Sequence, residues 1–155
     1  MSQKNLLNNI YLFKDLNDSE LGAVAAVAEV QSLAPGAEVF EQGDKATALY
    51  VIGFGTVRVH RKGSEGDDIP VTTLGTGSHF GEMAFIDEEK RSATVTAAEK
   101  TDLIKIRYDK LSSVLEENPA IAIKFFKALS KFLCGRLRVT TNDLSFAREK
   151  NISHF

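Results

Sequence analysis

Apolar positions near the start of the chain follow the spacing of a helix. Asn17 and Glu20 are placed as the two partners of a capping box, in which each side chain bonds the other residue's backbone N–H. The apolar residues that follow are three or four positions apart, as on one buried helix face: Leu21, Val24, Ala25 and Ala28. The apolar segment 12–16 before the cap is expected to anchor this helix. We therefore predict a helix that runs through Ala28.

From Val30 to about Arg107 the pattern changes to short runs of β-branched and aromatic residues. Turn signals containing Gly or Pro separate these runs about every 8–12 residues, a spacing typical of a β-barrel or β-sandwich. The expected strands are 39–40, 48–52, 56–60, 69–74, 93–97 and 102–106. The polar stretch 63–68 is expected to be a hairpin loop.

After Tyr108 the helical spacing returns. Residues 109–116 are predicted to form a short helix that ends before Pro119, because proline disfavours helix in the residue preceding it. A long helix is predicted from Ala120 to about Arg148, with an apolar seam at Phe126, Leu129, Leu133, Leu137, Thr140 and Leu144. Such a helix is longer than one domain needs, so its far half is expected to pack on a second copy of the chain. The alternative is that the far half lies on its own barrel or frays.

Length, charge and cysteine content narrow the class of protein. A chain of 155 residues is about one domain. A net charge of −2 and a pI near 5.9 argue against a nucleic-acid-binding surface. The longest apolar run, 21–28, is far too short to span a membrane, and the N-terminus lacks the layout of a signal peptide. The lone Cys134 fits a reducing cytoplasm.

The candidate chemistry lies between Gly75 and Ala97. Gly81 allows a close approach of the backbone, and residues 83–86 can form one helical turn whose free N–H groups favour an anion. Arg91 supplies a fork of donors for a phosphate, and Ser92 adds a hydroxyl. Glu82 can only accept hydrogen bonds when ionised, so it suits a ligand hydroxyl. Phosphate and sugar hydroxyl groups recognised so close together indicate a nucleotide or a sugar phosphate.

The sequence Phe-Gly-Glu-Met-Ala-Phe-Ile at 80–86, followed by Arg-Ser-Ala-Thr-Val at 91–95, resembles the phosphate-binding cassette of cyclic nucleotide-binding domains. These domains occur in the catabolite activator protein family, in kinase regulatory subunits and in cyclic nucleotide-gated channels. The resemblance implies that Glu82 holds the ribose 2′-hydroxyl and that Arg91 pairs with the cyclic phosphate. It also implies that the backbone of Gly81, Met83 and Ala84 and the hydroxyl of Ser92 complete the cradle. Lys90 stands where many members of the family have Pro.

A second match lies in the long helix. Arg-Leu-Arg-Val-Thr-Thr at 136–141 resembles the dimer helix of the catabolite activator protein family. The resemblance implies that Thr140 bonds the base bound by its own subunit, that Thr141 reaches the partner's ligand, and that Arg136 lies near the base edge. The candidate ligand-binding set is therefore Val71, Phe80, Gly81, Glu82, Met83, Ala84, Arg91, Ser92, Ala93, Arg136, Thr140 and Thr141.

The resemblance implies a mainly β (α+β) fold: an antiparallel β-roll or jelly-roll barrel with N-terminal helices, a short cassette helix and a long C-terminal helix. It covers about residues 12–146, and we expect a single domain over 1–155, with the roll at about 30–107 and the C-terminal helices at about 109–149. After the long helix too few residues remain for a DNA-reading domain. The expected function is that of a cytoplasmic, non-enzymatic, homodimeric sensor of cAMP, with cGMP as the alternative ligand, which signals through its C-terminal helix to an unidentified partner protein.

Two other functions stay open at this stage. The roll could serve as a scaffold for protein interaction or dimerisation without binding a ligand. A metal enzyme of the cupin type would need His60, His79 and Glu82 as metal ligands, but the chain lacks the His-x-His pair of such sites. We therefore expect no metal and no cofactor.

Overall fold

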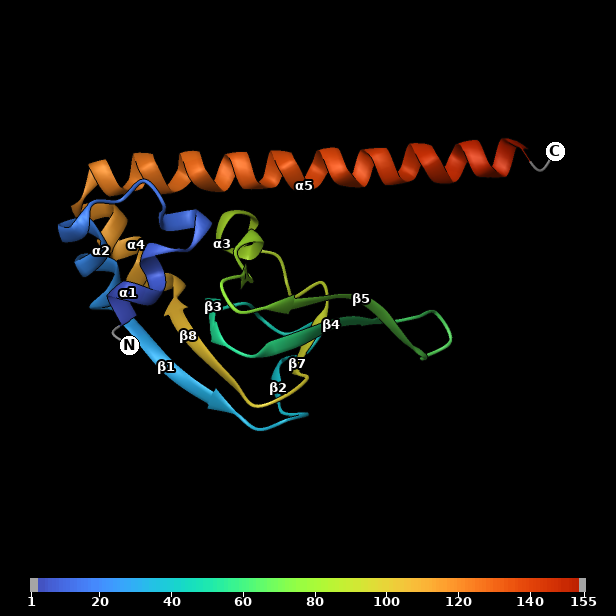
Figure 1. Cartoon of the computed structure of the whole chain (residues 1–155), viewed down its shortest axis with the longest axis horizontal. Coiled ribbons are helices and arrows are strands. Elements are labelled where there is room, and N and C mark those ends of the chain that lie inside the picture. Colours follow the sequence, from blue (N-terminus) through green and yellow to red (C-terminus); the bar gives the residue numbers. More distant parts are fainter. Residues whose placement is uncertain (1–2, 154–155) are drawn as a thin grey trace.

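The computed structural model describes residues 3–153, which form two antiparallel sheets, a group of helices at one end and one long helix (Figure 1). The helices are α1 (Gln3–Asn8), a short 3-10 helix (Tyr11–Phe13), α2 (Asp18–Ala25), α3 (Met83–Asp87), α4 (Tyr108–Glu117) and α5 (Pro119–Ser153). The strands are β1 (Ala28–Leu33), β2 (Glu38–Phe40), β3 (Ala48–Phe54), β4 (Thr56–Lys62), β5 (Asp68–Gly75), β6 (His79–Phe80), β7 (Thr94–Ala97) and β8 (Thr101–Arg107).

One sheet has the strand order β1-β8-β3-β6 and the other β2-β7-β4-β5, and every pair in them is antiparallel. The first sheet is covered on both faces, which strand β3 illustrates. Leu49 and Val51 face a cluster formed with the helices, whereas Tyr50 and Ile52 face the second sheet. This alternation follows from the two-residue period of a strand. The predicted antiparallel roll is confirmed.

The N-terminal helices, α4 and the first half of α5 share the helical cluster, which includes the fully buried Phe13, Leu111 and Phe125. The predicted capping box begins α2: Asn17 Oδ1 accepts from Glu20 N–H, and Glu20 Oε1 accepts from Asn17 N–H, both at 2.9 Å. Glu20 also accepts from Lys124 Nζ at 2.7 Å, which joins α2 to α5. The packing therefore fixes the near end of α5 on the domain.

The far half of α5 extends beyond the domain. An α-helix rises 1.5 Å per residue, so the 35 residues of α5 reach about 52 Å. Within the predicted seam Leu129 is buried, whereas Leu137 and Leu144 are more than half exposed. Figure 1 shows this part of the helix running free of the roll, beside the β4–β5 hairpin. The far half therefore does not lie on its own barrel, and its packing on a second copy of the chain stays a prediction.

The structure differs from the sequence prediction at the end of the first predicted helix, at one missed strand and at the end of the last helix. The first helix ends at Ala25, and Ala28 begins β1, which the apolar spacing did not reveal. β1 pairs with β8 over six residues, from Ala28 opposite Ile106 to Leu33 opposite Thr101. This long-range pairing overrides the helical propensity of an alanine-rich run. The two-residue strand β6 was also missed, because it forms only by pairing with β3. The other strands and helices that were predicted by range agree to within a few residues, apart from the last helix, which runs to Ser153.

Candidate functional site

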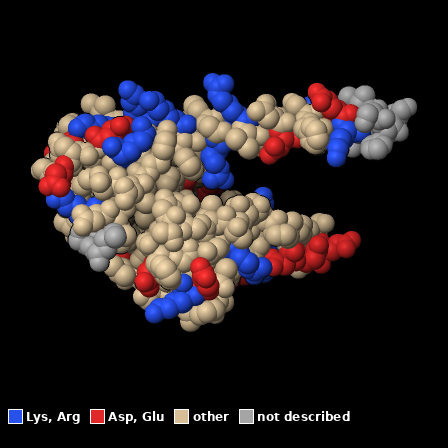
Figure 2. All heavy atoms as spheres, in the orientation of Figure 1, with Lys and Arg blue, Asp and Glu red and all other residues tan. Residues whose placement is uncertain are grey.

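A pocket opens between the second sheet, α3 and α5. The cavity has a volume of about 200 Å³. The whole depression, including the part that is open to solvent, has a volume of about 860 Å³. Figure 2 shows the molecular surface hollowed between the far half of α5 and the β4–β5 hairpin. The pocket walls combine apolar strand residues with the polar cassette, the layout expected of a small-molecule site.

The structure brings most of the predicted site residues together in this pocket. Those that line it are Val71, Phe80, Gly81, Glu82, Met83, Ala84, Arg91, Ser92, Ala93 and Arg136. Thr140 and Thr141 do not line it. They lie one turn beyond Arg136 on α5, where they are exposed, and their hydroxyls donate to the carbonyls of Arg136 and Leu137. Because these protons are committed to the helix, the two hydroxyl oxygens remain available as acceptors.

Arg91 is buried and held by contacts from distant segments. Its guanidinium lies 3.9 Å from the centroid of the Phe40 ring. Nη1 donates to the Gly81 carbonyl at 3.3 Å and to the Tyr108 hydroxyl at 3.2 Å, and Nη2 donates to the Ala48 carbonyl. Nε has no hydrogen-bond partner. A guanidinium has five N–H donors, so Nε–H and one N–H of Nη2 are left for an anion.

Gly81 occupies the narrowest part of the cassette. Its φ of 80° lies in the left-handed region, which glycine adopts without steric cost. A Cβ at this position would lie 2.8 Å from Arg91 Nη1 and 3.3 Å from the Ala48 carbonyl oxygen. The Gly81 carbonyl accepts hydrogen bonds from Arg91 and from Tyr108. This one backbone oxygen therefore joins Gly81, near the start of the cassette, to Arg91 near its end. Burial raises the pKa of the Tyr108 phenol, an effect that Arg91 partly offsets, so this hydroxyl stays protonated and donates at neutral pH.

Glu82 is also buried, and it faces a histidine. Glu82 precedes α3 directly, and its Oε1 lies 3.3 Å from Nδ1 of His79, three residues earlier. The side chains are 5% and 3% exposed, respectively. The buried carboxylate of Glu82 and the buried guanidinium of Arg91 therefore lie in one cassette. The family resemblance assigned Glu82 to a ligand hydroxyl and Arg91 to a phosphate.

Sequence reasoning missed three side chains that support the site. Phe40 stacks on Arg91, Tyr108 bonds Arg91 and Gly81, and His79 contacts Glu82. His79 adjoins the cassette and could have been noticed there, although the sequence placed it only in the metal alternative. Phe40 and Tyr108 carry no local signal, since only the folding of β2 and α4 against the cassette brings them to it.

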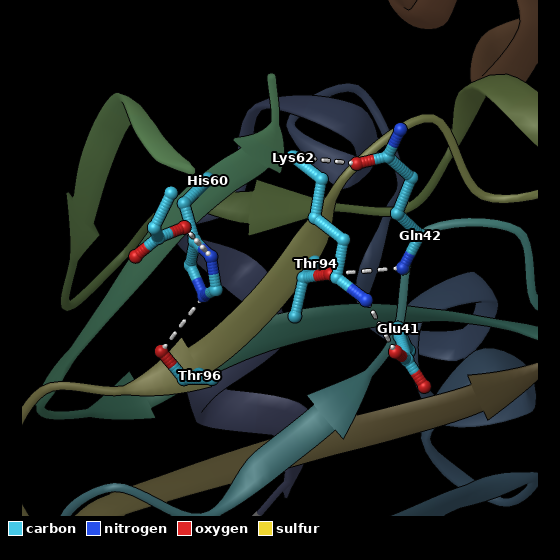
Figure 3. A network of polar contacts seen from close by, with 7 residues as sticks. Glu41, Gln42, His60, Lys62, Thr94 and Thr96 are labelled. Carbon is cyan, nitrogen blue, oxygen red and sulfur yellow. Dashed lines mark hydrogen bonds and ion pairs between the residues drawn. The ribbon is translucent and has the colours of Figure 1, made fainter. Parts of the chain in front are cut away.

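Of the three side chains that a cupin-type metal site would need, His79 and Glu82 are in contact, but His60 lies in the other sheet. His60 is on β4, where its Nδ1 lies 2.6 Å from Asp68 Oδ1 and its Nε2 lies 3.4 Å from Thr96 Oγ1 (Figure 3). His79 and Glu82 belong to β6 and the cassette, in the other sheet and the loop that follows it. Within the part of the chain that the structure describes, no group of three or more His, Cys, Asp or Glu side chains is arranged to hold a metal ion.

Three comparisons place the chain among known proteins. A family model described as "Cyclic nucleotide-binding domain" matches residues 30–118. The cyclic AMP receptor protein of Thermus thermophilus is 31% identical over 143 residues, which are 90% of this chain and 64% of the relative. A cGMP-dependent protein kinase of Eimeria tenella is 33% identical over 112 residues, which are 72% of this chain and 11% of the kinase.

A solved structure shows the same fold. The crystal structure of the Thermus thermophilus catabolite activator protein superposes with a TM-score of 0.77 at 30% identity, over 88% of this chain and 62% of that one. The chain spans less than two thirds of the length of the curated relatives named above. None of the described helices combines the length and the apolar content needed to cross a bilayer.

Proposed function

The chain belongs to the family of cyclic nucleotide-binding domains, and we propose that it is a sensor whose pocket binds cAMP in preference to cGMP and passes occupancy to a partner protein through α5. The observation that carries this proposal is the burial of Glu82 and Arg91 in the wall of one pocket. Buried charged groups are costly without partners, and a cyclic nucleotide supplies a hydroxyl for one and an anion for the other.

The phosphate is assigned to Arg91 and Ser92. Nε of Arg91 is a buried donor without a partner, and such a donor is costly until an acceptor reaches it. The Nε–H and the remaining N–H of Nη2 form a fork that fits two phosphate oxygens. The exposed hydroxyl of Ser92 is adjacent in sequence. The N–H groups of the first turn of α3, at Met83 and Ala84, add donors that the helix itself does not use.

The ribose and the base are assigned to opposite sides of the pocket. Glu82 accepts from the 2′-hydroxyl, and the exposed side chains of Val71 and Met83 form apolar walls for the base. Arg136 brings α5 to the pocket rim. Thr140 and Thr141 lie beyond it and offer acceptors, which suit the 6-amino donor of adenine better than the 6-carbonyl of guanine. This polarity supports cAMP.

A second copy of the chain is assigned to the far half of α5. Leu137 and Leu144 lie seven residues apart on one stripe of that helix, and both are exposed. A parallel pair of such helices would cover the stripe and bring Thr141 toward the partner's ligand. We place this sensor in the cytoplasm, since its one cysteine needs no disulfide partner there. We assign it no catalytic step.

Differential scanning fluorimetry of the full chain with cAMP, cGMP and cyclic dinucleotides tests the proposal. At about 100 times the dissociation constant, a ligand specific for the folded state adds about 2.7 kcal/mol of stability, so the melting temperature should rise by several degrees. cAMP should give the largest rise. The internal contacts of Arg91 with Ala48 and Tyr108 favour one other function, a roll that needs no ligand to stay ordered. That scaffold function predicts no shift with any nucleotide, a result that would contradict the sensor proposal.

A further inference from the structure

His79 is a buried histidine that the proposed nucleotide contacts leave unused. It does not line the pocket, yet its Nδ1 lies 3.3 Å from Glu82 Oε1. A carboxylate only accepts hydrogen bonds, so a hydrogen bond between Nδ1 and the Glu82 carboxylate requires the tautomer or cation that carries a proton on Nδ1. The two atoms are within ion-pair distance but are not aligned as a hydrogen bond, and Nε2 has no partner either. Contacts at binding sites are often poorly aligned before the ligand arrives.

The His79 ring also contacts the long helix. The centroid of the His79 ring lies 4.4 Å from that of the Phe132 ring on α5, with the two rings tilted by 57°. The guanidinium carbon of Arg136 lies 5.7 Å from the centroid of the same Phe132 ring. Arg136 in turn lines the pocket. A continuous series of contacts therefore joins Glu82, at the pocket wall, to the segment of α5 that borders the pocket.

We propose that His79 is a positioning residue with two parts: its Nδ1–H sets the Glu82 carboxylate for the ribose 2′-hydroxyl, and its ring ties that carboxylate to α5 through Phe132. The inference rests on the proposed binding of a cyclic nucleotide. One carboxylate oxygen of Glu82, Oε1, faces His79 Nδ1, which leaves the other for the ligand. An acceptor that is held in advance loses little side-chain entropy when the ligand binds, so selectivity for the hydroxyl increases.

Two substitutions separate the two parts. His79→Phe keeps an aromatic ring against Phe132 and removes the donor. His79→Asn keeps a side-chain amide close to the position of Nδ1 and removes the ring. Thermal melting of each variant confirms that the fold is kept. Titration calorimetry then compares cAMP with 2′-deoxy-cAMP, which lacks the hydroxyl that Glu82 would bind.

The wild type should bind cAMP more tightly than 2′-deoxy-cAMP. His79→Phe should reduce this preference at least about fivefold, the scale of one net hydrogen bond, whereas His79→Asn should stay within about twofold of the wild type. In a background of Glu82→Ala, His79→Phe should change the preference no further, because partners in one interaction are not additive. The inference would be overturned if His79→Phe left the preference unchanged, or if His79→Phe and His79→Asn reduced it equally. It would also be overturned if adding His79→Phe to Glu82→Ala reduced the preference further.

Hydrogen exchange tests the ring. Addition of cAMP should protect the α5 amides around Phe132 in the wild type and in His79→Phe, and protect them less in His79→Asn. Equal protection in all three proteins would overturn the link to α5. Failure of the wild type to bind either nucleotide would refute the proposed function and, with it, this inference. If the wild type binds cAMP but its preference over 2′-deoxy-cAMP does not depend on His79, only the inference is refuted.

Discussion

At the scale of single residues, Arg91 has two tasks. Its Nε–H, which has no partner in the protein, is proposed to bind the ligand phosphate, and its other donors bond the Ala48 and Gly81 carbonyls and the Tyr108 hydroxyl. A variant that removes the side chain should therefore lose both affinity and stability. The structure adds the second effect, which the sequence pattern does not indicate.

We expect Arg91→Ala to weaken cAMP binding by about 3–5 kcal/mol, the cost of removing one partner of a buried charge pair, or roughly a hundred- to several-thousandfold. Arg91→Lys should recover only part, because an ammonium cannot form the bidentate fork. Calorimetry measures the affinity, and a melting curve the accompanying loss of stability. Arg61→Ala, on an exposed part of β4, is the control. Binding by Arg91→Ala within threefold of the wild type would contradict the phosphate assignment.

Glu82 should discriminate between ribose and deoxyribose. Glu82→Ala should weaken cAMP binding by about 1.5–3 kcal/mol, the scale of a hydrogen bond to a charged group. Binding of 2′-deoxy-cAMP should change much less, since the analogue lacks the hydroxyl. Both titrations are made on both proteins. The ribose role is disproved if the wild type and the variant discriminate equally.

At the scale of elements, Glu20 connects the start of α2 to α5. The backbone N–H of Asn17, and then the bond from Lys124, lower the pKa of the Glu20 carboxyl below its ordinary value of 4.5. A lowered pKa means that the folded protein favours the ionised form, so this stabilisation is complete above about pH 4.5 and is lost as the pH falls through the folded-state pKa.

The difference in melting temperature between the wild type and Glu20→Gln should therefore be largest near neutral pH and shrink as the pH falls below about 4.5. Melting curves at several pH values on both proteins measure it. When both proteins also carry Lys124→Ala, the pH-dependent part of this difference in melting temperature should be smaller. A difference that stays constant, or grows toward acid pH, would show that the carboxylate of Glu20 does not stabilise this junction.

The far part of α5 should determine which base is preferred. Thr140 and Thr141 keep their protons on the helix carbonyls and present acceptors, so they favour adenine. Thr140→Ala and Thr141→Ala should each reduce the preference for cAMP over cGMP by about two- to tenfold, the value of one hydrogen bond, while binding of the cyclic phosphate persists. Titrations of the wild type and both variants with each nucleotide measure this. A wild-type preference for cGMP that disappears in Ser92→Ala would move base reading to the cassette.

At the scale of the whole molecule, we expect the exposed stripe of α5 formed by Leu137 and Leu144 to pack on a second copy of the chain. Replacing Leu137 and Leu144 together by Lys should raise the dissociation constant of the dimer at least about a hundredfold, since each buried leucine contributes about 1.5–3 kcal/mol. Val139 and Phe146 are equally exposed but lie on the opposite side of the helix, so their replacement by Lys is the matched control. Sedimentation equilibrium distinguishes the cases. A wild-type monomer at high concentration, or equal effects of both pairs, would refute this interface.

Much of this protein is determined by its sequence alone. Local rules place the capping box at Asn17 and Glu20, the change from helical to strand spacing near residue 30, and the start of the last helix at Ala120, one residue after the observed start. The cassette is also readable, because its acceptor, its glycine and its arginine lie within eleven residues and fold together as one loop. These features depend on neighbours along the chain, so their pattern survives without knowledge of the fold.

Only the tertiary structure decided the rest, since it depends on contacts between distant segments. Ala28 is in a strand because β8 pairs with it across nearly eighty residues of sequence. The direction of the Arg91 guanidinium is set by Phe40, Ala48 and Tyr108, none of which belongs to the cassette. The placement of Phe132 against His79 requires α5 to return over β6. Local propensity cannot report such contacts, because each is formed by packing rather than by the residues on either side.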